Sequence, residues 1–164
     1  MEYREMKMQA GTERPSLLGF GCMRFPKTPE GKIDENGAAE LIDAAIRNGV
    51  NYLDTAYPYH EGASEPFMGR LLKRYDRKRL YLATKLPMWL VKSLEDAKRL
   101  FEEQRERLQV DYIDFYLLHG LNRDRWDTIC KLGLIDWAEE LQRQGRIRYL
   151  GFSFHDNYET FETI

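Results

Sequence analysis

Apolar residues along this chain fall into two kinds of block, and the two kinds alternate. Short continuous apolar runs are typical of buried strands, whereas apolar residues spaced by three and four positions are typical of one face of a helix. The pattern predicts five strands, at 17–22, 50–53, 80–84, 113–118 and 147–152.

Capping residues and glycines predict a helix after each strand. The first predicted helix begins at Asp34 and ends at Gly49, and the second begins at Ser64 and carries Phe67 to Leu72. The third begins at Ser93 with Asp96 and runs to Leu108. The fourth spans about Ile129 to Leu141, and the fifth begins at Asp156. Five strand–helix units therefore follow one another. Such a series is typical of a parallel sheet covered by helices, either a doubly wound open sheet or a (β/α)8 barrel.

The spacing of the units favours the barrel. The first polar residue after four of the strands recurs at steps of 31, 34 and 34 residues, at Asp54, Lys85, His119 and Ser153. The first turn, Gly19-Phe20-Gly21, also lacks the third glycine of a dinucleotide-binding fingerprint, since Arg24 stands there. A (β/α)8 TIM barrel needs eight units, so residues 1–164 are predicted to be the N-terminal portion of one barrel domain, with the remaining units absent from this chain.

Composition narrows the possible partners. With 43% hydrophobic and 32% charged residues, the chain is predicted to be an ordered globular protein. A formal charge of −2 argues against nucleic acid or an anionic membrane as the partner. No apolar run is long enough for a membrane span, and the first residues lack the apolar core of a signal peptide, so we expect a cytoplasmic location. Cys22 and Cys130 have no CxxC spacing and are expected to be free thiols, with no metal site.

The carboxyl ends of barrel strands carry the candidate chemistry, because active sites of such barrels form there. Asp54, Lys85 and His119 occupy that level, and Tyr59 follows Asp54 by five positions. A phenol with an unperturbed pKa of about 10 is a poor acid at neutral pH, but an adjacent ammonium stabilises its phenolate and a carboxylate can anchor that ammonium. The four side chains are therefore expected to converge and to exchange a proton with a carbonyl oxygen. A hydride would have to come from a cofactor.

Each of these residues also has a structural interpretation. Asp54 could cap a loop, Lys85 could be a solvated lysine at a strand end, and His119 could be a core histidine with satisfied hydrogen bonds. Tyr59 is one of ten tyrosines. Their joint placement at successive strand ends, in register with the unit repeat, favours a site.

Four segments resemble the motifs of the aldo-keto reductase family in order and spacing: Asp54-Thr55-Ala56-x-x-Tyr59, Ala83-Thr84-Lys85, Leu117-Leu118-His119 and Gly151-Phe152-Ser153. The resemblance spans almost the whole chain. It implies an NADP(H)-dependent oxidoreductase that reduces an aldehyde or ketone to an alcohol. The implied proton donor is Tyr59, tuned by Lys85 and Asp54, while His119 orients the carbonyl.

The resemblance also implies a cofactor site, with contacts at Gly21, Cys22, Met23, Asp54 and Ser153. Independently of the resemblance, Tyr57 and Trp89, with Trp126 as a further candidate, lie on loops after strands and could form an apolar substrate wall or pack the rim of the barrel. The family's phosphate and adenosine contacts lie mainly after the fifth strand. The activity of this chain alone is therefore expected to be negligible, and the open barrel could self-associate.

Two departures limit the resemblance. Most relatives have Asn after the serine, whereas this chain has Phe154, which puts one nicotinamide contact in doubt. Several sequence segments resemble those of a microbial subgroup that often carries a C-terminal 4Fe-4S segment. The cysteine cluster that would bind such an iron-sulfur group is not found in these residues.

Three alternatives stay open. The chain could be a non-catalytic barrel that serves as a regulatory or scaffold subunit, or an inactive truncated fragment. A metal-dependent hydrolase using Asp54, His60 and His119 is a third, although the chain lacks the usual HxH or ExxH spacing.

Overall fold

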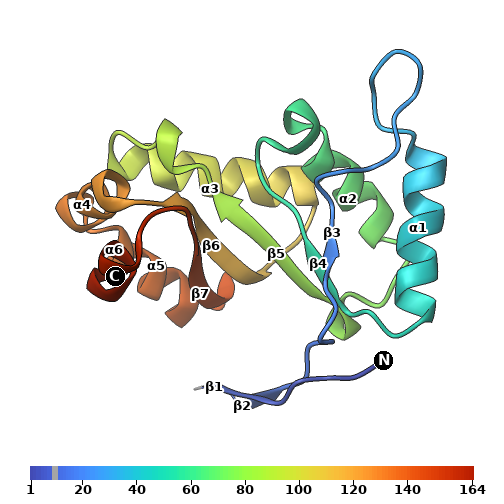
Figure 1. Ribbon diagram of the computed structural model, residues 1–164, viewed down its shortest axis with the longest axis horizontal. Coiled ribbons are helices and arrows are strands. Elements are labelled where there is room, and N and C mark those ends of the chain that lie inside the picture. Colours follow the sequence, from blue (N-terminus) through green and yellow to red (C-terminus); the bar gives the residue numbers. More distant parts are fainter. Residues whose placement is uncertain (9–10) are drawn as a thin grey trace. The chain divides into compact units, whose positions relative to one another are not determined.

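Strands and helices alternate in the computed structural model, which describes residues 1–8 and 11–164 (Figure 1). The strands are β1 (Met6–Met8), β2 (Gly11–Glu13), β3 (Phe20–Gly21), β4 (Tyr52–Asp54), β5 (Tyr81–Leu86), β6 (Ile113–Leu121) and β7 (Ile147–Phe154). The α-helices are α1 (Glu35–Arg47), α2 (Ser64–Leu72), α3 (Leu94–Leu108), α4 (Arg123–Leu132), α5 (Leu134–Arg143) and α6 (Tyr158–Thr163). Short 3-10 turns are η1 (Tyr59–Gly62), η2 (Arg77–Arg79) and η3 (Met88–Leu90).

The larger sheet has five strands in the order β3-β4-β5-β6-β7, so neighbours in the sequence are neighbours in the sheet. The pairs β3–β4, β4–β5 and β6–β7 are parallel. Each connection between consecutive strands contains a helix, as parallel pairing requires. The predicted α/β class is confirmed.

The chain divides into two compact units, residues 1–83 and 84–164. Buried apolar side chains fill the first unit, including Ile42, Leu53 and Met68, which are fully buried. In the second unit Phe101 of α3 and Tyr116 of β6 meet edge to face, with ring centroids 5.1 Å apart. Helix α3 therefore packs on β6 in part through large aromatic side chains.

Helix α1 begins and ends as the sequence predicts. The Asp34 side chain accepts a hydrogen bond from the Gly37 N–H at 3.1 Å and so caps the first turn. At the other end Asn48 is the C-cap, and Gly49 has a φ of 92°, which glycine adopts without steric cost.

The sequence pattern did not predict the N-terminal hairpin of β1 and β2. This hairpin is joined to the start of β4 by a reciprocal pair of hydrogen bonds: Ser16 N–H donates to Asn51 Oδ1 at 2.7 Å, and Asn51 N–H donates to Ser16 Oγ at 3.1 Å. The hairpin thus binds at the amino end of β4, opposite the end that carries Asp54.

Four predicted boundaries were wrong. The strand expected at 17–22 is confined to Phe20–Gly21, because the residues before it pair with the start of the chain: Ser16 forms an isolated β-bridge with Tyr3, and the Leu17 N–H donates to the Glu2 carbonyl oxygen. Ser64 does not cap α2, since its hydroxyl donates to the Cys22 carbonyl oxygen instead. The helix expected at 129–141 is two helices, α4 and α5, separated by Gly133 at a φ of 64°. Asn157, not Asp156, caps α6 by accepting a hydrogen bond from the Thr160 N–H at 2.9 Å.

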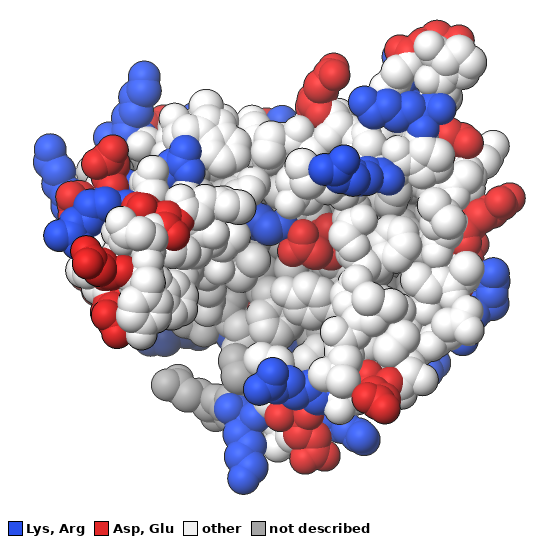
Figure 2. Space-filling view, in the orientation of Figure 1, with Lys and Arg blue, Asp and Glu red and all other residues white. Residues whose placement is uncertain are grey.

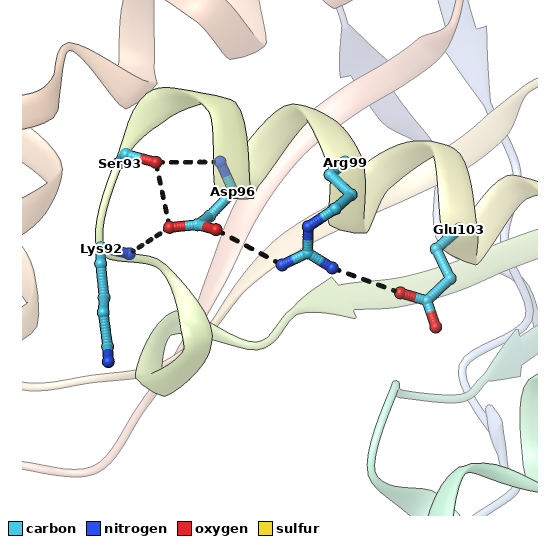
Figure 3. A network of polar contacts seen from close by, with 5 residues as sticks. All are labelled: Lys92, Ser93, Asp96, Arg99 and Glu103. Atoms are coloured by element: carbon cyan, nitrogen blue, oxygen red, sulfur yellow. Dashed lines mark hydrogen bonds and ion pairs between the residues drawn. The ribbon is translucent and has the colours of Figure 1, made fainter.

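Helix α3 begins as predicted, at a capping network shown in Figure 3. The Ser93 Oγ accepts a hydrogen bond from the Asp96 N–H at 3.2 Å. Asp96 in turn accepts from the Lys92 N–H at 3.2 Å and lies 3.4 Å from Arg99.

Basic and acidic side chains lie interspersed on the face drawn in Figure 2. Neither basic nor acidic side chains dominate that face. In the described parts of the chain, no helix combines the length and hydropathy that crossing a bilayer demands.

Candidate functional site

Asp54 is the last residue of β4, and the strands on either side hold its backbone in place. Its carbonyl oxygen accepts a hydrogen bond from the Cys22 N–H at 2.8 Å, and it is paired in register with Ala83 of β5. The next residue, Thr55, donates its N–H to the Ala83 carbonyl oxygen at 2.9 Å. The half-buried Asp54 side chain therefore emerges from a backbone fixed on both sides.

The loop after Asp54 carries Tyr57 and Tyr59, both half-buried. Its shape depends on His60, which has a φ of 52°, in the left-handed region. His60 Nε2 accepts a hydrogen bond from the Phe25 N–H at 3.0 Å, and the two rings stack with centroids 5.4 Å apart. Burial, and secondarily the charge of Lys27, lowers the pKa of His60, which favours the neutral imidazole that can accept this bond.

The three predicted cofactor residues at the end of β3 and directly after it differ in exposure. The Cys22 thiol is fully buried, 3.7 Å from the sulfur of Met68. Gly21 and Met23 on either side are exposed. At this segment, therefore, only Gly21, Met23 and the backbone can reach a ligand.

Lys85 lies within β5, and its side chain is only 5% exposed. A fully buried polar network fixes its backbone: Gln104 of α3 donates through Nε2 to the Lys85 carbonyl oxygen at 3.0 Å and to Thr84 Oγ1 at 3.2 Å. The Tyr116 hydroxyl donates to Gln104 Oε1 at 2.8 Å. The sequence pattern does not indicate this support for Lys85, because a lone glutamine in a charged helix has no distinctive spacing.

A β-bulge presents His119. The register of β6 and β7 pairs Leu118 with Phe152 and Leu121 with Phe154, so His119 and Gly120 together lie opposite the single residue Ser153. The Gly120 N–H donates to Ser153 Oγ at 2.7 Å. Ser153 thus satisfies a backbone group at the bulge, while its own hydroxyl proton has no acceptor among the described residues. Bulges of this kind re-aim side chains next to sites.

The His119 ring lies beside Trp89 of η3, with ring centroids 5.0 Å apart. Burial lowers the pKa of His119 to about 4, with further contributions from Lys85, Arg125 and His155, all of which carry or can acquire a positive charge. The imidazole is therefore neutral at physiological pH, with one N–H donor and one acceptor nitrogen.

The structure divides the predicted site residues between its two units. Gly21, Cys22, Met23, Asp54, Tyr57 and Tyr59 belong to the first unit, and Lys85, Trp89, His119 and Ser153 to the second. Within the second unit Lys85, Trp89, His119 and Ser153 gather around the ends of β5 and β6. Convergence of all four proposed catalytic side chains stays a prediction.

Arg125 is a further residue of this region that the sequence pattern did not indicate. The guanidinium donates to the Gly120 carbonyl oxygen and lies over the Trp89 ring, with Cζ 5.8 Å from the centroid. Because the helix was expected to begin only near 129, Arg125 was not placed at a helix start. The signal was Asn122, which caps α4 by accepting from the Arg125 N–H at 3.0 Å.

A metal site finds no support in residues 1–8 and 11–164. They contain no group of three histidine, cysteine or acidic side chains able to hold an ion, and His60 Nε2 is engaged by the Phe25 N–H. A cavity of about 570 Å³ lies in the first unit, and its lining includes Tyr3, Asn51 and Tyr81. It is at the amino ends of β4 and β5. The candidate residues Asp54 and Lys85 lie at the other end of these strands.

Comparisons with known proteins agree on one family. The model of the aldo/keto reductase family matches residues 17–164. Over 176 aligned residues, the chain is 33% identical to "Aldo-keto reductase YhdN" of Bacillus subtilis, covering 100% of this chain and 51% of the relative.

Solved structures give the same result. The holo form of the aldo-keto reductase AKR11C1 from Bacillus halodurans superposes with a TM-score of 0.76 at 34% identity, over 94% of this chain and 50% of that one. An aldo/keto reductase from Klebsiella pneumoniae in complex with NADP and acetate superposes with a TM-score of 0.74 at 26% identity, over 91% and 49% of the two chains. The chain spans about half the length of these relatives.

Proposed function

Because this chain belongs to the aldo/keto reductase family, we propose that it is the catalytic half of an NADP(H)-dependent oxidoreductase that reduces an aldehyde or ketone to an alcohol. The family fold is a (β/α)8 barrel, and the five-stranded parallel sheet is part of such a barrel. The observation that carries the proposal is the environment of His119, a neutral imidazole beside a buried lysine and under an indole ring.

Each proposed catalytic residue has a distinct task. Tyr59 donates a proton to the carbonyl oxygen of the substrate, and Lys85, anchored by Asp54, stabilises the phenolate that is left. His119 donates a hydrogen bond from its neutral ring to the same oxygen and so fixes the carbonyl. The pairing of Asp54 with Ala83, two residues before Lys85, supports this arrangement.

The residues at the strand ends fit a nicotinamide cofactor, which when bound supplies the hydride. Ser153 has a hydroxyl proton to donate to a carboxamide while its oxygen accepts from Gly120. At Gly21 a Cβ would meet nothing within 4 Å, so a ligand has open access to this backbone. The NADP bound by the Klebsiella pneumoniae relative also supports this assignment. We assign Gly21, Met23, Asp54 and Ser153 to the cofactor, together with the backbone of Cys22.

Trp89 and Tyr57 are proposed to form the substrate wall. The Trp89 side chain is 43% exposed although its ring touches His119, so it offers apolar surface next to the hydrogen-bond donor. A small organic carbonyl compound in the cytoplasm is the expected substrate class.

Replacing Tyr59 tests the proposed chemistry. In the full-length natural protein, Tyr59→Phe should lower kcat for aldehyde reduction by about 10²- to 10⁴-fold, because a general acid contributes that much, and should leave NADPH affinity nearly unchanged. Tyr158→Phe, which removes a hydroxyl from the exposed Tyr158 of α6, is the matched control and should be silent. Near-normal turnover by Tyr59→Phe would refute the assignment. Absence of NADPH-dependent turnover in the natural protein would favour a non-catalytic barrel.

A further inference from the structure

Arg125 is a cation at the edge of the proposed site, and none of the acidic residues that the structure describes forms an ion pair with it. Its guanidinium donates to the Gly120 carbonyl oxygen and lies over Trp89. No carboxylate in the described part of the chain lies within ion-pair distance of it. An arginine that is half-buried is usually paired, because removing its charge from water is costly.

The local fold is arranged around this guanidinium. Gly120 has a φ of 64°, and a Cβ at this position would lie 2.9 Å from Arg125 Nη1. Glycine at the bulge therefore lets the guanidinium approach the end of β6. On the helix side, the Asn122 cap fixes the backbone of Arg125 in the first turn of α4.

Positive charge accumulates around His119. Lys85 and Arg125 both act on the imidazole and, together with burial, hold it in the neutral form. The Arg125 guanidinium attracts an anion, and with one N–H engaged by Gly120 it keeps further donors for a carboxylate. Trp89, lying between an arginine and a histidine, offers apolar surface to the carbon chain of a ligand.

We propose that Arg125 and Trp89 form an anion subsite beside His119, and that the substrates are aldehydes carrying a carboxylate a few bonds from the carbonyl. This inference rests on the proposed function. His119 would hold the carbonyl oxygen while Arg125 binds the carboxylate, so that the two ends of the substrate are fixed together.

Two aldehydes of equal chain length test the subsite: 4-oxobutanoate, which has a terminal carboxylate, and butanal, which does not. In the full-length protein Arg125→Gln should lower kcat/KM for 4-oxobutanoate by about 10- to 100-fold, the usual effect of losing a charge-assisted hydrogen bond, and change that for butanal less than about threefold. Arg125→Lys, which keeps the charge but loses the planar fork, should recover part of the loss. Lys131→Gln removes an exposed cation from the same helix and should leave kcat/KM unchanged for both substrates.

Other results would overturn the inference. Equal losses for both aldehydes would show that Arg125 acts through the fold or through His119 rather than on a carboxylate. A raised KM for NADPH with unchanged KM for NADH would assign Arg125 to a cofactor phosphate instead. If neither aldehyde is reduced, the proposed function fails, and titration with succinate then decides on the subsite alone: binding that Arg125→Gln weakens supports it, and no binding refutes it.

Discussion

His119 is the residue whose ionisation the structure defines best. Burial and the nearby positive charges hold its pKa at about 4, against about 6.5 for a free histidine. Its proposed task, donating one hydrogen bond while staying neutral, matches this environment. A protonated imidazole would instead add a third cation beside Lys85 and Arg125 and compete with Tyr59 as the acid.

We expect the His119 ring to titrate near pH 4 in NMR spectra of the folded protein. Arg125→Gln should raise this pKa, because one of the positive charges that oppose protonation is removed, and Lys131→Gln should leave it unchanged. Since the unfolded chain binds the proton near pH 6.5 and the folded protein only near pH 4, the free energy of unfolding should fall as the pH drops through this window. A titration near pH 6.5 in the folded protein would contradict the described environment.

At the scale of the element, helix α3 depends on its first turn. The Ser93 cap and the Asp96 carboxylate share hydrogen bonds, and the bond with Ser93, followed by that from the Lys92 N–H, holds the pKa of Asp96 below its usual value (Figure 3). The same helix carries Gln104, which binds the backbone of Lys85. Loosening of α3 therefore bears on the proposed site as well as on stability.

Ser93→Ala should lower the free energy of unfolding by about 1 kcal/mol, because the N–H groups of the first turn lose their acceptor. Ser93→Thr keeps a hydroxyl at this position, so the free energy of unfolding should fall much less. Arg99→Gln removes the two ion pairs that the exposed Arg99 makes with Asp96 and Glu103, and should lower the free energy of unfolding by less than about 0.5 kcal/mol. Urea unfolding measures all three. Equal losses for the alanine and threonine variants would show that the cap contributes little.

At the scale of the whole molecule, the five strands in this chain have two outer members, β3 and β7. A closed barrel has no such edges, since each outer strand is paired. Phe152 of β7 and Phe161 of α6 are 38% and 48% exposed, and their rings are in contact with centroids 6.0 Å apart. This apolar surface lies at the end of the series of strands, where a further unit of the barrel would pack.

The 164-residue polypeptide expressed by itself should bind NADPH with a Kd of about 1 mM or weaker and show negligible reduction of aldehydes, because a large part of the expected cofactor surface belongs to later units. It should also self-associate as its concentration rises, since association buries apolar surface that is exposed in the monomer. Calorimetric titration and analytical ultracentrifugation measure both effects. Micromolar binding by a monomer would show that these residues build the cofactor site without the later units.

The sequence by itself determined the alternation of the five sheet strands with helices, and with it the parallel sheet, although not the β1–β2 hairpin or the division of α4 from α5. This was possible because apolar periodicity and capping are local: Asp34 and Ser93 cap the helices they were expected to cap. The candidate residues Asp54, Lys85, His119 and Ser153 were found by the same local repeat, one at each strand end.

Only the tertiary structure decided how these residues are presented. The bulge that aims His119 depends on the register between β6 and β7, and the support of Lys85 depends on Gln104 from a helix about twenty positions away. Arg125 meets Trp89 across 36 positions of sequence. Such contacts leave no periodic signal, because each is set by how two elements pack on each other and not by the residues within either one.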